Sequence, residues 1–345
     1  MNIHRFFAIS MLTVLFCQLN SRSPYRTPDL REPTITVRWS KEPGEVATFT
    51  NRYLQEYPFF KLFDKKFFYD HLFPNGSLTI RNSSATVDTA HLQNLIEGLL
   101  VEIKAKAKEY THFDVLQCKD FSRRKGCGLL IVKFKNYPFV VKLFIETPES
   151  FTQMWGKGMV PVFLFYLGGG VNRHLAGFTR ISNLETIKNR IDNDPIWSHR
   201  IELPRKWFWL PKDTQWLEIT GTNLGKKKHQ FIKIPATYAI IADAIEPRED
   251  DTIAEGEDAA LSLHICNMLE MSVDPHSNNV MIEKGTNKIV LIDTEHFPTI
   301  VGLDVDKHFD GYPSWIMHLM SRCAKSMFLT PKQAERKHKN PSLLA

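Results

Sequence analysis

Cysteine is scarce in this sequence. Only five occur among 345 residues, with no C-x-x-C pair and no spacing typical of metal ligands, so a zinc site is not expected. Cys118 and Cys127 flank a loop. Two alternatives stay open for them, a disulfide in an oxidising compartment or two free thiols.

A dominating basic tract is also missing. The formal net charge is only +6, and lysines and arginines lie beside many acids, so a nucleic acid is not the expected partner. The short basic runs at residues 123–125 and 226–228 are typical of solvated loops. Apolar residues make up 43% of the chain and aromatics 12%, which is enough for a sizeable core and excludes disorder of the whole chain.

Residues 1–20 have the layout of a signal peptide. His4 and Arg5 make a basic start, residues 6–17 form an apolar run too short to span a bilayer, and polar residues follow. This order predicts a secreted or exported protein that has no membrane span once the segment is removed. The alternative is an uncleaved start that is buried or anchors the chain to a membrane.

The next part of the chain divides by composition. Residues 21–44 are rich in Pro, Arg and Ser, which predicts an extended linker that packs little. Residues 45–112 are predicted to be a helical extension. Aromatic residues at 59–68 have helical spacing, and Asp88 can cap an amphipathic helix over residues 89–110.

A β-hairpin and the start of a helix are predicted after this extension. Residues 128–134 and 139–145 are apolar strands separated by a turn that contains Pro138. Thr147 can cap a helix whose first position is Pro148. Later elements are expected at residues 183–191 (helix), 216–220 and 231–246 (strands), 258–271 (helix), and 279–282 and 288–292 (a second hairpin).

Acidic and amide side chains gather around this second hairpin. Asp274 precedes it, Asn279 begins its first strand, and Asp293 follows its second strand. Phosphoryl transfer needs an acid near the attacking hydroxyl and oxygen ligands that hold Mg²⁺ on the nucleotide phosphates. This order favours Asp274 as the catalytic acid or base, and Asn279 and Asp293 as metal ligands. Glu295 is either an auxiliary ligand or a salt-bridge partner.

In order and type, these residues resemble the protein-kinase-like superfamily, especially atypical members whose loop reads D-x-H-x-x-N. The resemblance implies that Lys142, which ends a V-V-K segment in the first hairpin, is a catalytic residue that binds the nucleotide phosphates. It also implies an acid that orients Lys142, and Glu149 and Glu185 are the two candidates.

The same resemblance implies where the rest of a nucleotide binds. Asp243 and Ala244 belong to a segment similar to the hinge, whose backbone holds an adenine edge. Gly126 and Gly128 stand in place of the glycine-rich loop, although the G-x-G-x-x-G pattern itself is absent. The implied cofactors are ATP and Mg²⁺.

The implied fold is α+β, a two-lobed protein-kinase-like fold with an N-terminal helical extension and a reduced C-lobe. An N-lobe with an insertion and the hinge is expected over residues 113–246, the reduced C-lobe with the catalytic loop over 247–330, and a loose tail over 331–345. The expected function is ATP- and Mg²⁺-dependent phosphotransfer to an unidentified protein or small molecule. The alternatives are an exported pseudokinase and an interaction protein without catalysis.

Overall fold

The computed structural model describes residues 33–41, 45–50, 60, 62–118, 121–152, 171–225, 227–248 and 279–295, with short stretches between 261 and 273 and residue 317. The predicted signal segment, Asp274 and the tail lie outside these residues, as does most of the helix expected at 258–271. The described residues form a mixed α and β architecture. Among the described helices, none is long and apolar enough to cross a membrane.

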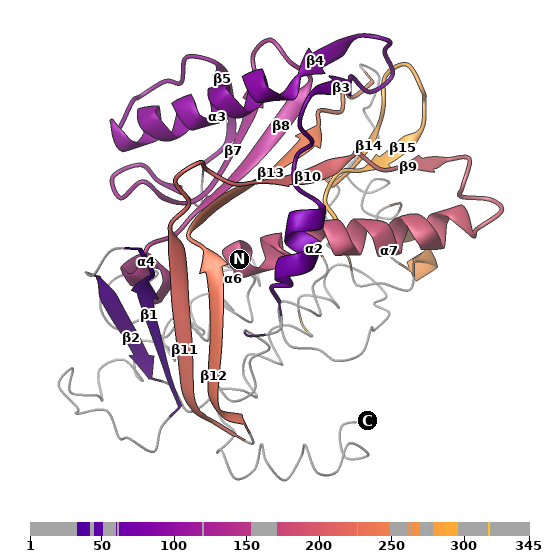
Figure 1. Cartoon of the computed structure of the whole chain (residues 1–345). Coiled ribbons are helices and arrows are strands. Elements are labelled where there is room, and N and C mark those ends of the chain that lie inside the picture. Colours follow the sequence, from indigo (N-terminus) through magenta and orange to yellow (C-terminus); the bar gives the residue numbers. More distant parts are fainter. Residues whose placement is uncertain are drawn as a thin grey trace, which may run out of the picture.

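A six-stranded antiparallel sheet lies at the centre of this architecture (Figure 1). Its order is β10-β13-β8-β7-β5, and β6 also pairs with β7. The strands are β5 (Phe113–Gln117), β6 (Phe121–Ser122), β7 (Cys127–Phe134), β8 (Phe139–Ile145), β10 (Lys206–Trp209) and β13 (Thr237–Asp243). The hairpin predicted over residues 128–145 is confirmed as β7 and β8, which are rich in the branched and aromatic residues that suit a pleated surface.

One face of the central sheet is covered by α3 (Thr89–Lys104), which lies above the sheet in Figure 1. The carboxylate of Asp88 accepts a hydrogen bond from the amide of Ala90 (3.0 Å), so the predicted cap is confirmed. The buried stripe of the helix packs against the odd-numbered residues of β8: Leu92, Ile96, Leu99 and Ile103 against Phe139, Val141 and Leu143. The helix ends at Lys104 rather than at residue 110, because Lys106 adopts a left-handed φ of 57°.

The opposite face of the sheet packs on three other helices, α2 (Lys65–Asp70), α6 (Val171–Gly177) and α7 (Arg180–Asp192). The helix expected at residues 183–191 is thereby confirmed within α7. Aromatic rings fill the contact: Tyr238 stacks on Phe144 and on Phe178, with ring centroids 4.7 Å and 4.4 Å apart. The short helix α4 (Pro148–Thr152) begins as predicted, because the Thr147 hydroxyl accepts a hydrogen bond from the amide of Ser150 (3.0 Å).

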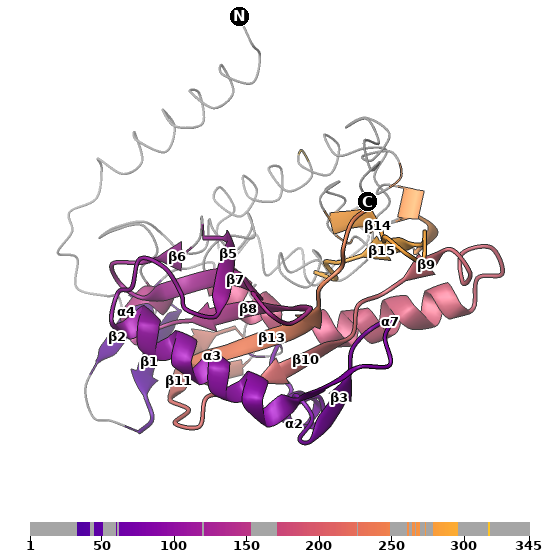
Figure 2. The ribbon, with the colours of Figure 1, turned by 90° about the horizontal axis from the view of Figure 1, so that it is seen from above.

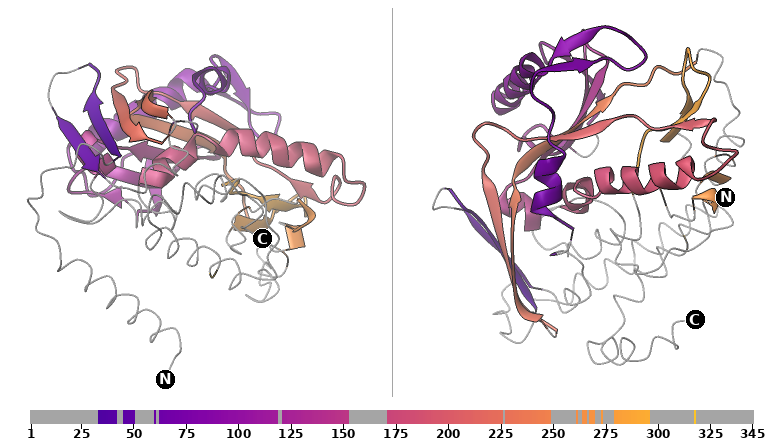
Figure 3. Two further views of the ribbon diagram at one scale, coloured as in Figure 1. Left: turned by 90° about the horizontal axis from the view of Figure 1, so that it is seen from below. Right: turned by 45° about the vertical axis from the view of Figure 1, so that its right-hand side comes forward.

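A four-stranded antiparallel sheet of order β12-β11-β1-β2 stands beside the central sheet (Figure 3). It contains β1 (Thr34–Trp39), β2 (Val46–Thr50), β11 (Trp216–Leu224) and β12 (Lys227–Pro235). The prediction of a loosely packed linker over residues 21–44 is wrong for β1, whose Ile35 and Val37 are buried. The alternating pattern T-I-T-V-R-W pairs with β11, some 180 residues away, and this overrides the local Pro- and Arg-rich composition.

Two smaller sheets complete the described part. The hairpin of β3 (Ser77–Thr79) and β4 (Thr86–Asp88) precedes α3, so residues 45–112 are not purely helical as predicted. The predicted second hairpin is confirmed as β14 (Val280–Ile282) and β15 (Ile289–Leu291), and β9 (Ile201–Glu202) joins β15 in parallel. Figure 2 shows this three-stranded sheet at the far end of α7. The predicted strand at residues 231–246 is divided at Ala236 into β12 and β13, which belong to different sheets.

Candidate functional site

The structure brings Lys142 and Asp293 into contact. Lys142 lies on β8 between Val141 and Leu143, whose side chains face α3, so its own side chain points to the opposite face of the sheet. Asp293 follows β15 by two residues. The Lys142 ammonium lies 3.1 Å from an Asp293 carboxylate oxygen, across 151 residues of sequence. Each side chain keeps 16% of its surface exposed, so the pair lies at the edge of the interior.

Arg180, the first residue of α7, joins this pair. One guanidinium nitrogen lies 3.2 Å from Asp293, and another donates to Glu295 at 2.5 Å, so the group bridges two carboxylates. The guanidinium also lies over the Phe144 ring, 5.9 Å from its centroid. Of the two alternatives for Glu295, the described residues therefore show the salt bridge.

The segment between Asp293 and Glu295 is also held from a third side. The ammonium of Lys206, on β10, donates to the Thr294 hydroxyl at 2.9 Å. The Thr294 hydroxyl in turn donates to the backbone carbonyl of Arg180 (2.6 Å). The side-chain amide of Asn183 donates to the backbone carbonyl of Thr294 (3.1 Å). Residues from β8, β10 and α7 thus fix residues 293–295 relative to the central sheet.

The electrostatics of this cluster follow from its burial and its charges. Burial opposes ionisation of Asp293, but Arg180, Lys142 and Lys206 outweigh it and hold the pKa of that carboxyl well below its usual range. Burial lowers the pKa of the Lys142 ammonium, with Asp293 opposing and Arg180 adding to the shift. Burial and the charge of Lys142 also lower the pKa of Lys206. The carboxylate is therefore ionised, and an anion beside the lysines favours their charged forms.

The second predicted metal ligand lies beside the first. The carbonyl of Asn279 accepts a hydrogen bond from the amide of Ile292 (2.9 Å), which places Asn279 next to the residue preceding Asp293. Asp274 lies outside the described residues. In the part of the chain that the structure describes, no three His, Cys, Asp or Glu side chains gather into a site that could hold a metal ion.

Neither acid predicted to orient Lys142 does so in the described residues. Glu185 lies on α7, and its carboxylate is 2.8 Å from the imidazole of His71 on α2. Glu149 lies in the first turn of α4, and Lys142 pairs with Asp293 instead. Sequence reasoning could not rank these residues, because helix phase relative to the sheet decides which one reaches Lys142.

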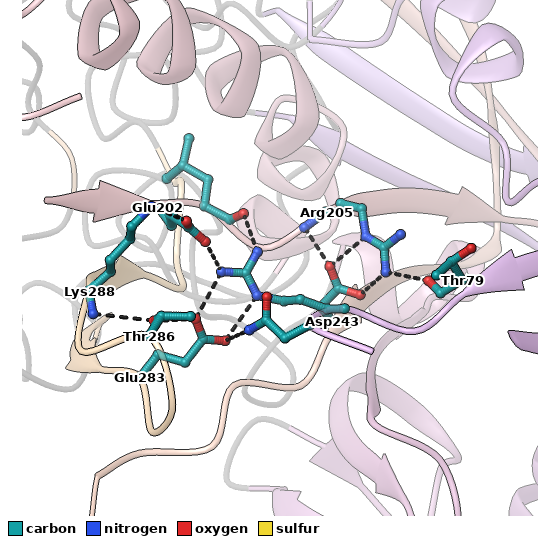
Figure 4. A network of polar contacts seen from close by, with 10 residues as sticks. Thr79, Glu202, Arg205, Asp243, Glu283, Thr286 and Lys288 are labelled. Atoms are coloured by element: carbon teal, nitrogen blue, oxygen red, sulfur yellow. Dashed lines mark hydrogen bonds and ion pairs between the residues drawn. The ribbon is translucent and has the colours of Figure 1, made fainter. Parts of the chain in front are cut away.

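The hinge residues are placed differently from the prediction. The buried carboxylate of Asp243 accepts two hydrogen bonds from the Arg205 guanidinium, both 2.8 Å long (Figure 4). It also accepts one from the backbone amide of Arg205. The amide of Asp243 donates to the Arg205 carbonyl (3.2 Å), and the amide of Ala244 donates to the Pro138 carbonyl (2.9 Å). The two amides assigned to an adenine edge are therefore already engaged within the protein.

The two predicted loop glycines form a tight hairpin turn instead of an open cradle. Gly126 and Gly128 have φ values of 65° and 109°, which favour glycine. The Gly126 amide donates to the Ser122 carbonyl (2.7 Å), and Gly128 pairs with Phe121 across the β6–β7 hairpin. The Gly126 amide is thus not free to bind phosphate, which corrects the assignment of this loop to cofactor binding.

Sequence reasoning missed two members of the cluster, Arg180 and Lys206. A signal for Lys206 does exist: in the K-W-F-W strand, it lies on the same face as the fully buried Phe208, two residues later. A lysine on the buried face of a strand in this sheet indicates a partner or a function. No comparable local signal marks Arg180, because it opens a helix of mixed composition.

Other polar residues tie the hairpin of β3 and β4 to the neighbouring sheets (Figure 4). The Arg81 guanidinium makes a two-point contact with Glu283, at 2.9 Å and 3.0 Å, and also contacts Glu202. Lys288 is the second cation on Glu202. We call Arg81, Glu202, Glu283 and Lys288 the Arg81 cluster. It holds the β14–β15 turn, and with it the segment that leads to Asp293, against β3 and β9.

Comparisons with known proteins find no match: no family model, no curated protein and no solved structure is similar to this chain.

Proposed function

We propose that this protein binds ATP with Mg²⁺ and transfers its terminal phosphoryl group, as an atypical member of the protein-kinase-like superfamily with a two-lobed fold. The observation that carries the proposal is the 3.1 Å contact between Lys142 and Asp293. In protein kinases, a lysine on a strand of the small lobe binds the nucleotide phosphates, and an aspartate after a later hairpin binds Mg²⁺. The contact brings two side chains of these types next to each other, and this supports the proposal.

The remaining roles follow from the resemblance and from position. Asn279 lies beside the Asp293 segment and would supply the second metal ligand, with Asp274 near the attacking hydroxyl. The acceptor is a protein or a small molecule. If the predicted export segment acts as a signal, the proposed activity requires delivery to a space that contains ATP, such as a host cell or a secretory compartment.

A second candidate function, nucleotide binding without transfer, is favoured by Arg180. Its guanidinium contacts both Asp293 and Glu295, the two carboxylates available to a metal ion near Lys142. A fixed cation at that position competes with Mg²⁺ by charge repulsion. Such a protein would be a pseudokinase that acts through binding.

The test is a thermal unfolding titration of the chain that begins at residue 21, combined with a measurement of ADP release. ATP with Mg²⁺ at one hundred times its Kd stabilises a folded protein by about 2.7 kcal/mol, which raises Tm by several degrees. Lys142→Ala and Asp293→Ala should both abolish this rise. Asp293 keeps Arg180 as a partner in Lys142→Ala, so this variant should fold.

The matched control is Lys133→Ala, which removes an exposed lysine from the neighbouring strand β7. It should leave the rise in Tm and the ADP release unchanged. A rise in Tm without ADP release supports the second candidate. If ATP with Mg²⁺ does not change Tm at any concentration, or if Lys142→Ala behaves as the wild type does, the proposed site is wrong.

A further inference from the structure

The cluster around Asp293 contains more positive than negative side chains. Lys142, Arg180 and Lys206 are three cations, and Asp293 and Glu295 are two carboxylates. Both carboxylates are engaged by Lys142 and Arg180. Among these five described side chains, the cations outnumber the carboxylates by one when all are charged.

Among the described residues, Lys206 forms no direct ion pair, although the charge of the nearby Asp293 carboxylate opposes the lowering of its pKa by burial. Its side chain is buried, with 6% of the residue exposed. In the part of the chain that the structure describes, its one hydrogen-bond partner is the neutral hydroxyl of Thr294. An ammonium has three donors, and a buried charge is costly unless it is paired. No carboxylate of a described residue accepts a hydrogen bond from this ammonium.

Arg180 adds a second reason to expect an anion here. Its guanidinium spans Asp293 and Glu295, so the positive charge that Mg²⁺ would bring to these carboxylates is already present in the protein. Lys142 and Asp293 each keep 16% of their side-chain surface exposed, which leaves the edge of the cluster open to solvent. A phosphate oxygen can approach the lysines from that edge. The two carboxylates oppose it, and the three cations outnumber them.

We propose that Lys206, together with Lys142 and Arg180, binds a phosphate group directly, so that phosphate compounds bind at this site without Mg²⁺. This proposal rests on the proposed function in one respect: the assignment of the ligand as a nucleotide. The shared chemistry is a phosphate group with two negative charges, which either ATP or an inorganic polyphosphate supplies. Lys206 then binds the ligand, a role that the protein-kinase resemblance does not assign to it.

The experiment measures binding in the presence of EDTA, with ATP and with tripolyphosphate as separate probes, by calorimetry and by thermal unfolding. We expect both probes to bind without Mg²⁺, with Kd values that increase as salt is added. Lys206→Met keeps the length of the side chain but removes the charge, and should weaken binding about tenfold, the effect of one charge-assisted hydrogen bond. Because it removes an unpaired buried charge, this variant should also fold.

The matched control is Lys188→Met, an exposed lysine of α7 that pairs with Asp192 on the helix surface, and its Kd should equal that of the wild type. Binding of ATP only when Mg²⁺ is present would overturn the inference and leave the proposed function standing. Binding of tripolyphosphate but not of ATP would support the phosphate site and overturn the nucleotide function. If neither probe binds under any condition, or if Lys206→Met binds as the wild type does, the inference is wrong.

Discussion

The contact between Arg81 and Glu283 should contribute strongly to stability. Only 5% of the Glu283 side chain and 15% of the Arg81 side chain are exposed, and two parallel hydrogen bonds of 2.9 Å and 3.0 Å join them. Removing one partner of a buried ion pair costs about 3 to 5 kcal/mol, because the other charge stays buried. We therefore expect Arg81→Ala to lower the free energy of unfolding by several kcal/mol.

The loss in free energy of unfolding should lie at the lower end of that range, because Glu283 keeps other hydrogen-bond donors. Asn82 (3.2 Å) and Thr286 (2.9 Å) still donate to its carboxylate in the variant, and Lys288 still neutralises Glu202. The expected loss is about 3 kcal/mol. It should be measured by urea unfolding at neutral pH. The slope of the transition should equal that of the wild type, because an altered slope would indicate a change in the unfolded or native ensemble.

A more exposed arginine–glutamate pair, joined by one hydrogen bond, provides the control. Arg38 lies 2.7 Å from Glu218, but 60% of its side chain is exposed, so Arg38→Ala should cost less than about 1 kcal/mol. The double variant Arg81→Ala with Glu283→Gln should lose less than the sum of its two single variants, because it leaves no unpaired charge. If Arg81→Ala costs no more than Arg38→Ala, burial does not decide the strength of this contact and the reasoning fails.

Two further changes test the face of the sheet that carries the site. Burial raises the pKa of the Glu146 carboxyl from 4.5 to about 7. The contribution of this group to the free energy of unfolding is therefore present below pH 4.5 and is lost as the pH rises through 7. The loss amounts to about 3 kcal/mol. Glu146→Gln should therefore stabilise the protein by up to that amount at pH 8 and hardly at all at pH 4, as measured by urea unfolding, and equal effects at both pH values would contradict this. Gly177 lies against the rings of Tyr238 and Phe144, and a Cβ there would come within 2.9 Å of the Phe144 ring. Gly177→Ala should lower the free energy of unfolding by about 1 to 3 kcal/mol in the same assay, whereas Gly98→Ala, in the open on α3, should not destabilise the protein.

Elements with strong local patterns could be predicted from the sequence. The β7–β8 and β14–β15 hairpins and the capped start of α3 appear where turn residues, strand composition and the Asp88 cap indicate them. The position of Asp293 after the second hairpin and the resemblance of the V-V-K segment to a kinase strand selected Asp293 and Lys142 as site residues, and the structure places the two side chains in contact. Cys118 and Cys127 are both free thiols in the structure, which is the second of the two alternatives considered for them.

Other features depend on contacts between distant parts of the chain. β1 lies in a stretch with the composition of a linker, and it becomes a strand because β11 offers a partner edge. The surroundings of the predicted hinge residues are a related case: the carbonyls of Arg205 and Pro138 accept hydrogen bonds from the amides of Asp243 and Ala244, and this cannot be read from either segment alone.

The sequence by itself determined the hairpins, the main amphipathic helix and the two polar residues that end or interrupt apolar strands, because these follow from periodicity and turn chemistry over a few residues. Only the tertiary structure decided which charges meet. Arg180 reaches Asp293 and Lys206 reaches Thr294 because the phase of α7 and the order of β10 and β8 around β13 place them on one face. No local pattern encodes that arrangement.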